Sequence, residues 1–316
     1  MGLFPKHVLE YVALAGIPRG PQSKIFVVDP AHGATGNTGE SWGSPLMTVS
    51  AALAKCTTGH HDVVLVVASG TAVTETAAVD WNLNLTHLIG IGTDTPHGKR
   101  TRIISGTDDL SPFITVSGYG CTFKNLRIVH EQADDTGSLI CVKVTGIRNR
   151  FESVEFCGNA TESSALDTGC SLYLQGASEC LFKDCVIGLD TIAEATGCMG
   201  LVIHGSGGMN RTRFENCIFN AYANSTSVGF VESLGATGID RMLVFKDCEF
   251  WNMGPQTIAT AFVFGAVDYN YKRIALINCF KLGATDWDHA NTGMVYVYIP
   301  SSGTTNAAGT AVVTSS

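Results

Sequence analysis

The sequence has few charged side chains, no long apolar run and no paired-cysteine motif. Charged residues make up 15% of it, and the net charge of −8 comes without a basic cluster, so we expect no nucleic-acid partner. No run of about 18 apolar residues occurs, so we expect no membrane-spanning helix. The first twenty residues, MGLFPKHVLEYVALAGIPRG, place an acidic residue inside a short apolar run and lack a cleavage site, which argues against a secretory signal.

The eleven cysteines are an odd number and include no C-x-x-C pair. We therefore expect free thiols in a protein made in a reducing cytoplasm, rather than a disulfide scaffold. His60 and His61 are adjacent, but a metal site there would need further ligands that the sequence does not place nearby. We expect no metal and no cofactor.

What the sequence does contain is a repeat. The string LFKDCVIG at 181–188 returns as RFENCIFN at 213–220 and as VFKDCEFW at 244–251. Further copies are anchored at Phe123, Phe151 and Leu276, so that successive anchors are 28, 31, 32, 31 and 31 residues apart. Self-similarity at such a period indicates a solenoid or another repeat architecture.

Three positions of the repeat carry related side chains. The position two residues after the anchor is mostly Asn or Asp. These residues tolerate left-handed backbone, so we interpret this position as a tight bend between two short strands. The anchor is aromatic, and the position after the bend is often a thiol, a small group that suits a buried column. The predicted structural ladder consists of Phe123, Phe151, Phe182, Phe214 and Phe245, of Asn125, Asp184, Asn216, Asp247 and Asn278, and of Cys185, Cys217, Cys248 and Cys279.

A further strand follows each copy at a similar spacing, as in FITVSG at 113, CVKVTG at 141 and SLYLQG at 171. Each repeat thus has about three short strands, which predicts an all-β, right-handed parallel β-helix of about 31 residues per coil. The residue after the anchor alternates in charge through Lys124, Glu152, Lys183, Glu215 and Lys246. Opposite charges on neighbouring strands stabilise a stack, so we expect these side chains to form one column.

The predicted organisation is an N-terminal segment over 1–24, a β-helix over 25–300 and a polar tail over 301–316. Phe4, Val8, Tyr11 and Val12 have the spacing of a short amphipathic helix. We expect that helix either to cap the open end of the solenoid or to dock onto a partner.

Residues 25–76 resemble the opening of the pectate-lyase-like right-handed β-helix superfamily. The matching features are a strand that ends in Asp29, a Gly36–Asn37–Thr38–Gly39 turn, a helix over Val49 to Lys55 and a strand from Asp62 to Val67. The resemblance extends over about 25–300 and is specific for fold. It leaves activity open, because the superfamily includes lyases, hydrolases, adhesins and phage virion proteins.

The chain looks like a bacteriophage virion structural protein made in the host cytoplasm. The resemblance implies a non-enzymatic capsid decoration or cement protein, or a short spike, assembled as a homotrimer and in contact with virion proteins such as the major capsid protein. The alternatives are a tail-spike depolymerase, either a lyase or a glycosidase, and a glycan-binding adhesin. Both alternatives would act on a surface polysaccharide.

No catalytic residue is assigned by motif. A glycosidase needs two carboxylates at a defined separation, and a lyase needs a base. Asp134 and Asp135, in the loop EQADDTG after a strand, are the candidate groove acids if the protein is an enzyme. A solvated turn is the alternative interpretation of this loop.

Overall fold

The computed structural model describes residues 16–17, 19–107, 110–130, 139–158, 169–194, 197–235, 237–264, 274–288 and 295–298. These residues form one helix, α2 (Val49–Leu53), and two parallel sheets. The first sheet contains β1 (Ile25–Val28), β2 (Val63–Val67), β3 (Val73–Glu75), β5 (His87–Ile91), β6 (Arg102–Ser105), β8 (Thr122–Val129), β10 (Arg150–Cys157), β12 (Leu181–Lys183), β13 (Val186–Ile187), β15 (Arg213–Glu215), β16 (Ile218–Ala221), β18 (Leu243–Lys246), β19 (Glu249–Asn252), β21 (Ile274–Ile277), β22 (Phe280–Leu282) and β24 (Val295–Tyr298). The second sheet contains β4 (Val79–Trp81), β7 (Ile114–Val116), β9 (Ile140–Val144), β11 (Cys170–Leu174), β14 (Met199–Ile203), β17 (Gly229–Ser233), β20 (Ile258–Phe264) and β23 (Ala284–Asp288).

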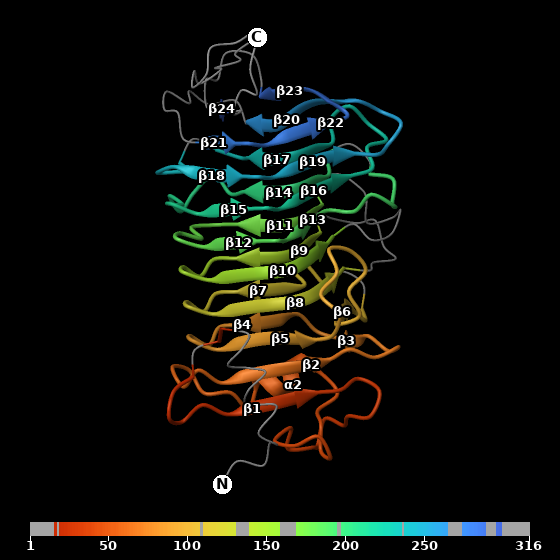
Figure 1. The fold of residues 1–316 in the computed structure, drawn as a ribbon, viewed down its shortest axis with the longest axis vertical. Helices are drawn as coiled ribbons and strands as arrows, with labels where there is room; N and C mark the ends of the chain where they lie inside the picture. Colours follow the sequence, from red (N-terminus) through yellow and green to blue (C-terminus); the bar gives the residue numbers. More distant parts are fainter. Residues whose placement is uncertain are drawn as a thin grey trace.

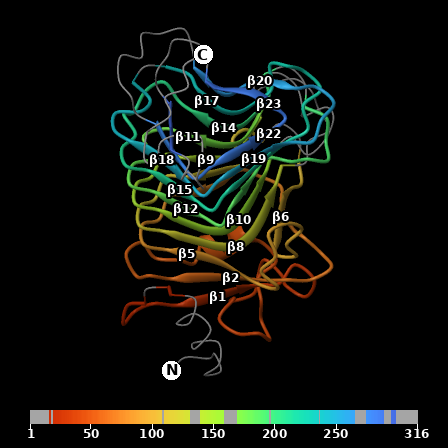
Figure 2. The same ribbon diagram turned by 45° about the horizontal axis from the view of Figure 1, so that its top comes forward.

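The coils stack along the long axis of the molecule, from β1 at one end to β23 and β24 at the other (Figure 1). The main path of the first sheet is β1-β2-β5-β8-β10-β12-β15-β18-β21-β24, and the second sheet runs from β4 to β23 in coil order. Anchor residues pair directly across coils, as in Phe151 with Phe123 and with Phe182. Figure 2 shows the first sheet bending around two sides of the core while the second sheet closes the third. The chain is therefore a parallel β-solenoid with very little helix.

The bend in the first sheet has left-handed backbone in successive coils. Asn125, Ser153, Asp184, Asn216, Asp247 and Asn278 have φ between 52° and 55°. Their side chains bond from coil to coil: Asn216 Nδ2 donates to Asp184 Oδ1 at 2.8 Å, and Asn278 Nδ2 donates to Asp247 Oδ1 at 2.7 Å. Amide and carboxylate side chains thus satisfy the conformational and hydrogen-bonding needs of the bend together.

The aromatic anchors form a continuous buried stack. From Phe123 to Phe245, neighbouring ring centroids are 4.8, 4.7, 4.6 and 4.8 Å apart, and the rings are within 10° of parallel. These spacings match the distance of about 4.8 Å between adjacent strands, so each ring lies directly over the next. All eleven cysteines are free thiols, and all but Cys56 are buried.

The alternating charges after the anchors are in register, but they do not pair uniformly. Lys124 and Glu152 form an ion pair at 2.7 Å. Lys183 and Lys246 instead lie 3.9 and 3.7 Å from the bend carboxylates Asp184 and Asp247. The column therefore exists, although the acidic bend residues compete for its lysines.

Helix α2 begins at Val49 after the N-cap Thr48, whose side chain accepts a hydrogen bond from Ala51. The buried Glu75 carboxylate accepts hydrogen bonds from the Val49 and Ser50 amides. The helix ends two residues earlier than the resemblance implied. The predicted N-terminal helix with Phe4, Val8, Tyr11 and Val12, and the tail over 301–316, lie outside the described residues. Within the described part, no helix is long and apolar enough to cross a membrane.

Glu194 is a carboxylic acid buried in the wall of the solenoid. Only 2% of the residue is exposed, and among the described residues no hydrogen-bond partner reaches its Oε2. Burial raises the pKa of Glu194 to about 8, against a smaller opposing effect of a backbone hydrogen bond from Tyr222. The protonated acid is therefore the favoured form in the folded protein.

Replacing Glu194 by glutamine is expected to stabilise the protein in a pH-dependent way. The folded-state pKa lies above the unfolded value, so this group lowers the free energy of unfolding as pH rises from about 4.5 to about 8. Glu194→Gln removes that loss, and at pH 8 it should be more stable than wild type by a few kcal/mol, with no difference at pH 4. Urea unfolding at both pH values measures this, with Glu179→Gln as an exposed control. A gain of equal size at both pH values would contradict the assignment.

Candidate functional site

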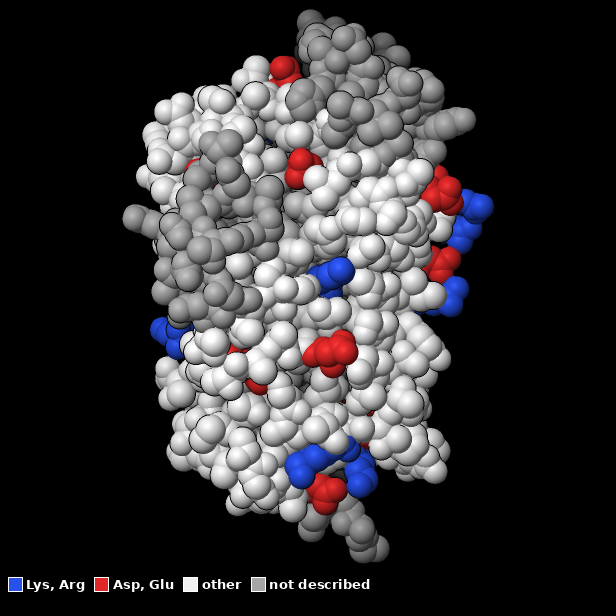
Figure 3. Space-filling view, turned by 180° about the vertical axis from the view of Figure 1, so that it is seen from behind, with Lys and Arg blue, Asp and Glu red and all other residues white. Residues whose placement is uncertain are grey.

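The outward face of the second sheet carries polar and aromatic side chains at one register position. Lys143 on β9 pairs with Tyr173 on β11, Tyr173 pairs with Val202 on β14, and Val202 pairs with Glu232 on β17. In-register parallel strands place these side chains in one row along the axis. Figure 3 views the molecule from the side of this sheet and shows that charged side chains are sparse there.

Tyr173 contacts Lys143 of this row on one side and, on the other, His204, which lies two residues beyond Val202. The Lys143 ammonium lies 5.6 Å from the centre of the Tyr173 ring, within the range of a cation–π interaction. On its other side, the Tyr173 ring is 5.8 Å from the His204 ring, at an angle of 43°. Burial, and secondarily the neighbouring Cys170 thiol, raise the pKa of Tyr173, so its hydroxyl stays protonated and can donate a hydrogen bond.

The hydrogen bonds of His204 define its tautomer. Its Nδ1 accepts from the backbone N–H of Ser206 at 3.2 Å and lies 3.0 Å from the Ser206 hydroxyl. A neutral imidazole that accepts at Nδ1 carries its proton on Nε2. The Lys143–Tyr173–His204 cluster therefore presents three donors: an ammonium, a phenol and an imidazole N–H.

Glu232 is the acidic group of the same row. Its side chain is partly buried, and burial raises its pKa above the ordinary glutamate value. Val202 separates it from Tyr173, which puts it two strand spacings, or roughly 10 Å, along the axis. A carboxyl group with a raised pKa beside a donor cluster can act as a proton acceptor for a bound ligand.

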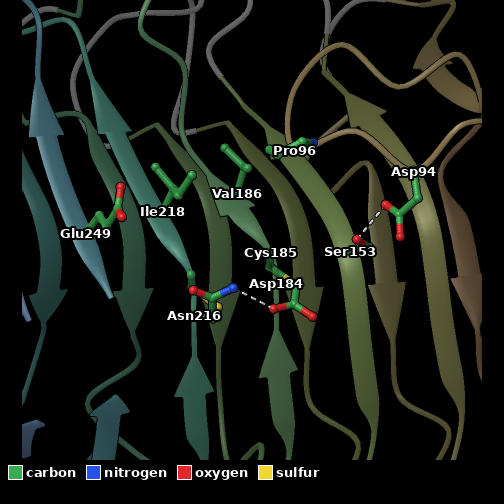
Figure 4. Close-up of a pocket in the computed structure, with 10 residues that line it drawn as sticks. Asp94, Pro96, Ser153, Asp184, Cys185, Val186, Asn216, Ile218 and Glu249 are labelled. Carbon is green, nitrogen blue, oxygen red and sulfur yellow. Dashed lines mark hydrogen bonds between the residues drawn. The ribbon is translucent and has the colours of Figure 1, made fainter. Parts of the chain in front are cut away.

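A concave feature lies over the bend of the first sheet. It is a pocket of about 260 Å³ between the loop that follows β5 and the strands β13, β16 and β19 (Figure 4). Two of its three carboxylates are tied to its walls: Asp94 accepts from the Ser153 hydroxyl at 2.6 Å, and Asp184 accepts from Asn216. The pocket is lined by Asp94, Pro96, Ser153, Asp184, Cys185, Val186, Asn216, Cys217, Ile218 and Glu249.

A buried charge cluster adjoins this pocket. Lys99 Nζ lies 3.7 Å from Glu155 Oε1, and Arg127 Nε lies 3.5 Å from Glu155 Oε2. Glu155 also accepts hydrogen bonds from the backbone amides of Gly98 and Lys99. Because its oxygens are occupied, Glu155 anchors the loop that follows β5 and is not available as a catalytic acid.

Only some of the residues predicted from the sequence lie at the pocket. Asp134 and Asp135 lie outside the described residues. The ladder residues are in the core and at the bend, and of these Asp184, Cys185, Asn216 and Cys217 line the pocket. His61 lies 3.2 Å from His87 through their ring nitrogens. Among the described residues, no three metal-ligating side chains are arranged to hold one ion.

The second-sheet cluster was missed by sequence reasoning. The strings CVKVTG and SLYLQG contain Lys143 and Tyr173 at the same offset, which was a usable signal. Val202 and Glu232 were not matched to this position. The steps from Tyr173 to Val202 and on to Glu232 are 29 and 30 residues, which differ from the first-sheet period.

Comparison with known proteins addresses the fold. No protein-family model matches the chain, and no curated protein matches it by sequence. A rhamnogalacturonan lyase structure matches with a TM-score of 0.62 and 14% identity, over 87% of this chain and 73% of that chain. The chain has a pectate-lyase-like parallel β-helix fold.

Two further matches have TM-scores below 0.5. The pectate lyase Pel9A matches at 0.47 with 15% identity, over 87% of this chain and 82% of that one. The ORF18 protein of Geobacillus virus E2 matches at 0.46 with 13% identity, over 92% of this chain and 63% of that one. At such identities the likeness concerns the β-helix fold alone, and activity has to be argued from this chain's own residues.

Proposed function

We propose that this β-helix is a glycan-binding protein of a phage particle, which holds an acidic surface polysaccharide on the outward face of its second sheet. The observation that carries the proposal is the Lys143–Tyr173–His204 cluster. An ammonium, a phenol and an imidazole N–H together offer donors for carboxylate and hydroxyl groups. The few charges on this face favour an extended ligand that is held by a small number of polar contacts.

The rest of the solenoid supports a scaffolding role. The aromatic stack, the bend hydrogen bonds and the parallel ladders give a stiff rod with successive coils about 4.8 Å apart. A stiff rod keeps the binding row pre-organised, which reduces the ordering cost of binding. The homotrimer and the attachment to virion proteins such as the major capsid protein belong to the same proposal, and light scattering of the purified protein tests the trimer.

Replacing Lys143 by alanine is expected to weaken binding of an acidic polysaccharide about tenfold to a hundredfold. A charged hydrogen bond contributes about 1.5–3 kcal/mol, which corresponds to that range. Affinity for polygalacturonate, measured by titration calorimetry at fixed salt, checks this, with dextran as the uncharged comparison. Lys183→Ala, on the first sheet, is the matched control. Equal weakening by both variants would show a nonspecific charge effect and overturn the site.

A depolymerase is the second candidate, and the raised pKa of Glu232 is the observation that favours it. In β-elimination, a base removes the proton next to a uronate carboxylate, the adjacent C–O bond to the neighbouring sugar breaks, and the product is an unsaturated sugar that absorbs ultraviolet light. Incubation of the wild-type protein with polygalacturonate tests for that absorbance. A product that Glu232→Gln abolishes would replace the binding proposal with a lyase, whereas binding without product supports the non-enzymatic reading.

A further inference from the structure

Four thiols form a column inside the bend of the first sheet. Cys185, Cys217, Cys248 and Cys279 occupy the same position of successive coils, and each is at most 4% exposed. Each thiol donates to the carbonyl of the anchor residue one coil earlier, at 3.4 to 3.6 Å. The sulfur atoms therefore follow one another along the axis.

The pocket of Figure 4 opens onto one end of this column. Cys185 and Cys217 line it, together with the carboxylates Asp184, Asp94 and Glu249. Three acidic side chains line this cavity of about 260 Å³. Lys99 lies 3.9 Å from Asp94 and Lys183 lies 3.9 Å from Asp184, whereas among the described residues no such ion pair involves Glu249. The paired thiols and a cavity with an acidic wall thus meet at one place.

The number of ligands available around one point indicates the kind of cation. Among the described residues, no three His, Cys, Asp or Glu side chains are arranged around one point, whereas zinc and calcium sites require more ligands than two. A linear S–metal–S unit needs only a pair. With metal–sulfur bonds of about 2.3 Å, as for zinc, it would span about 4.6 Å, close to the strand spacing of about 4.8 Å. Soft thiolates prefer soft ions such as Cu(I).

We propose that Cys185 and Cys217 bind one soft monovalent d10 cation, Cu(I) or Ag(I), between them, and that Cys248 and Cys279 form a second site of the same kind. Each metal–thiolate bond forms as one thiol proton passes to solvent, so a cation held by two thiolates releases two protons, and no electron is transferred. The backbone N–H of Cys248 donates to Cys279 Sγ at 3.4 Å, which places the two residues of the second pair in direct contact.

Silver titration of the full-length protein tests the proposal. Cys56→Ser is the background, because Cys56 is the half-buried thiol that would otherwise react first. Calorimetry in chloride-free buffer should show tight first-equivalent binding, about two protons released per ion by comparison of buffers, and a higher melting temperature. Adding Cys217→Ser should weaken the first equivalent at least tenfold, whereas adding Cys141→Ser, a buried thiol outside the column, should leave it unchanged.

Two outcomes would overturn the proposal. One is equal affinity in the Cys217→Ser and Cys141→Ser variants, which would place the ion elsewhere. The other is silver binding that lowers the melting temperature of the Cys56→Ser protein and removes its β circular dichroism, which would show reaction with unfolded chains. If Cys217→Ser does not fold, Cys185→Ser replaces it, and the same loss of at least tenfold is expected relative to Cys141→Ser.

Discussion

Replacing Phe182 by alanine is expected to destabilise the protein by about 3–5 kcal/mol. Phe182 is fully buried, and its ring lies 4.7 Å from that of Phe151 and 4.6 Å from that of Phe214. The backbone ladders on both sides fix the spacing of the coils, so the neighbouring rings cannot close the gap. The loss therefore includes both the transfer free energy of the ring and the cost of the cavity.

Urea unfolding of Phe182→Ala measures this loss, and Phe280→Ala provides the matched control. Phe280 lies in β22 of the same sheet, but it is 47% exposed. Its truncation leaves no enclosed cavity and should change the free energy of unfolding by less than about 1 kcal/mol. Similar losses in both variants would mean that the aromatic stack contributes no more than surface contacts do.

Replacing Glu155 by glutamine is expected to cost about 3–5 kcal/mol, because it removes the buried counter-charge of Lys99, whose other acidic neighbour, Asp94, lies 3.9 Å away and is half exposed. The Lys99 side chain is fully buried and that of Glu155 is 3% exposed. Glutamine keeps the shape of the side chain and removes its charge, so the change reports electrostatics rather than packing. The loop that follows β5 should also loosen, since Glu155 holds the amides of Gly98 and Lys99.

A double-mutant cycle with Lys99→Met separates these contributions. The double variant should recover much of the stability lost in Glu155→Gln, since the buried lysine charge is removed as well. Glu179→Gln, in the exposed pairs with Arg148 and Arg211 at 2.7 and 2.8 Å, is the control and should have little measurable effect. If the single and double variants are equally unstable, Lys99 and Glu155 are not energetically coupled.

The repeat could be found from the sequence because stacking places the same local requirements on every coil. An inward position must be apolar in every coil, and a bend must accept left-handed backbone in every coil. Phe182, Phe214 and Phe245 recur for the first reason, and Asp184 and Asn216 recur for the second. Residues that answer a local requirement remain visible in one sequence without any alignment.

The row with Lys143, Tyr173 and Glu232 is only partly visible in the sequence, since nothing local requires it. Lys143 and Glu232 are 89 residues apart and share a face only because four strands of the second sheet are in register. The same holds for Lys99 and Glu155, which meet because the loop after β5 folds over later coils. For Asp134 and Asp135, the polar sequence around them predicts a loop but does not say which residues surround that loop.

The sequence by itself determined the period, the parallel stacking, the aromatic and thiol columns and the bend, since these depend on residue type and spacing within one coil. Only the tertiary structure decided which outward side chains become neighbours, which carboxylates are buried and where a cavity opens. The physical reason is that the spacing between equivalent positions differs between the two sheets. Contacts across coils therefore depend on backbone register and loop packing rather than on any local pattern.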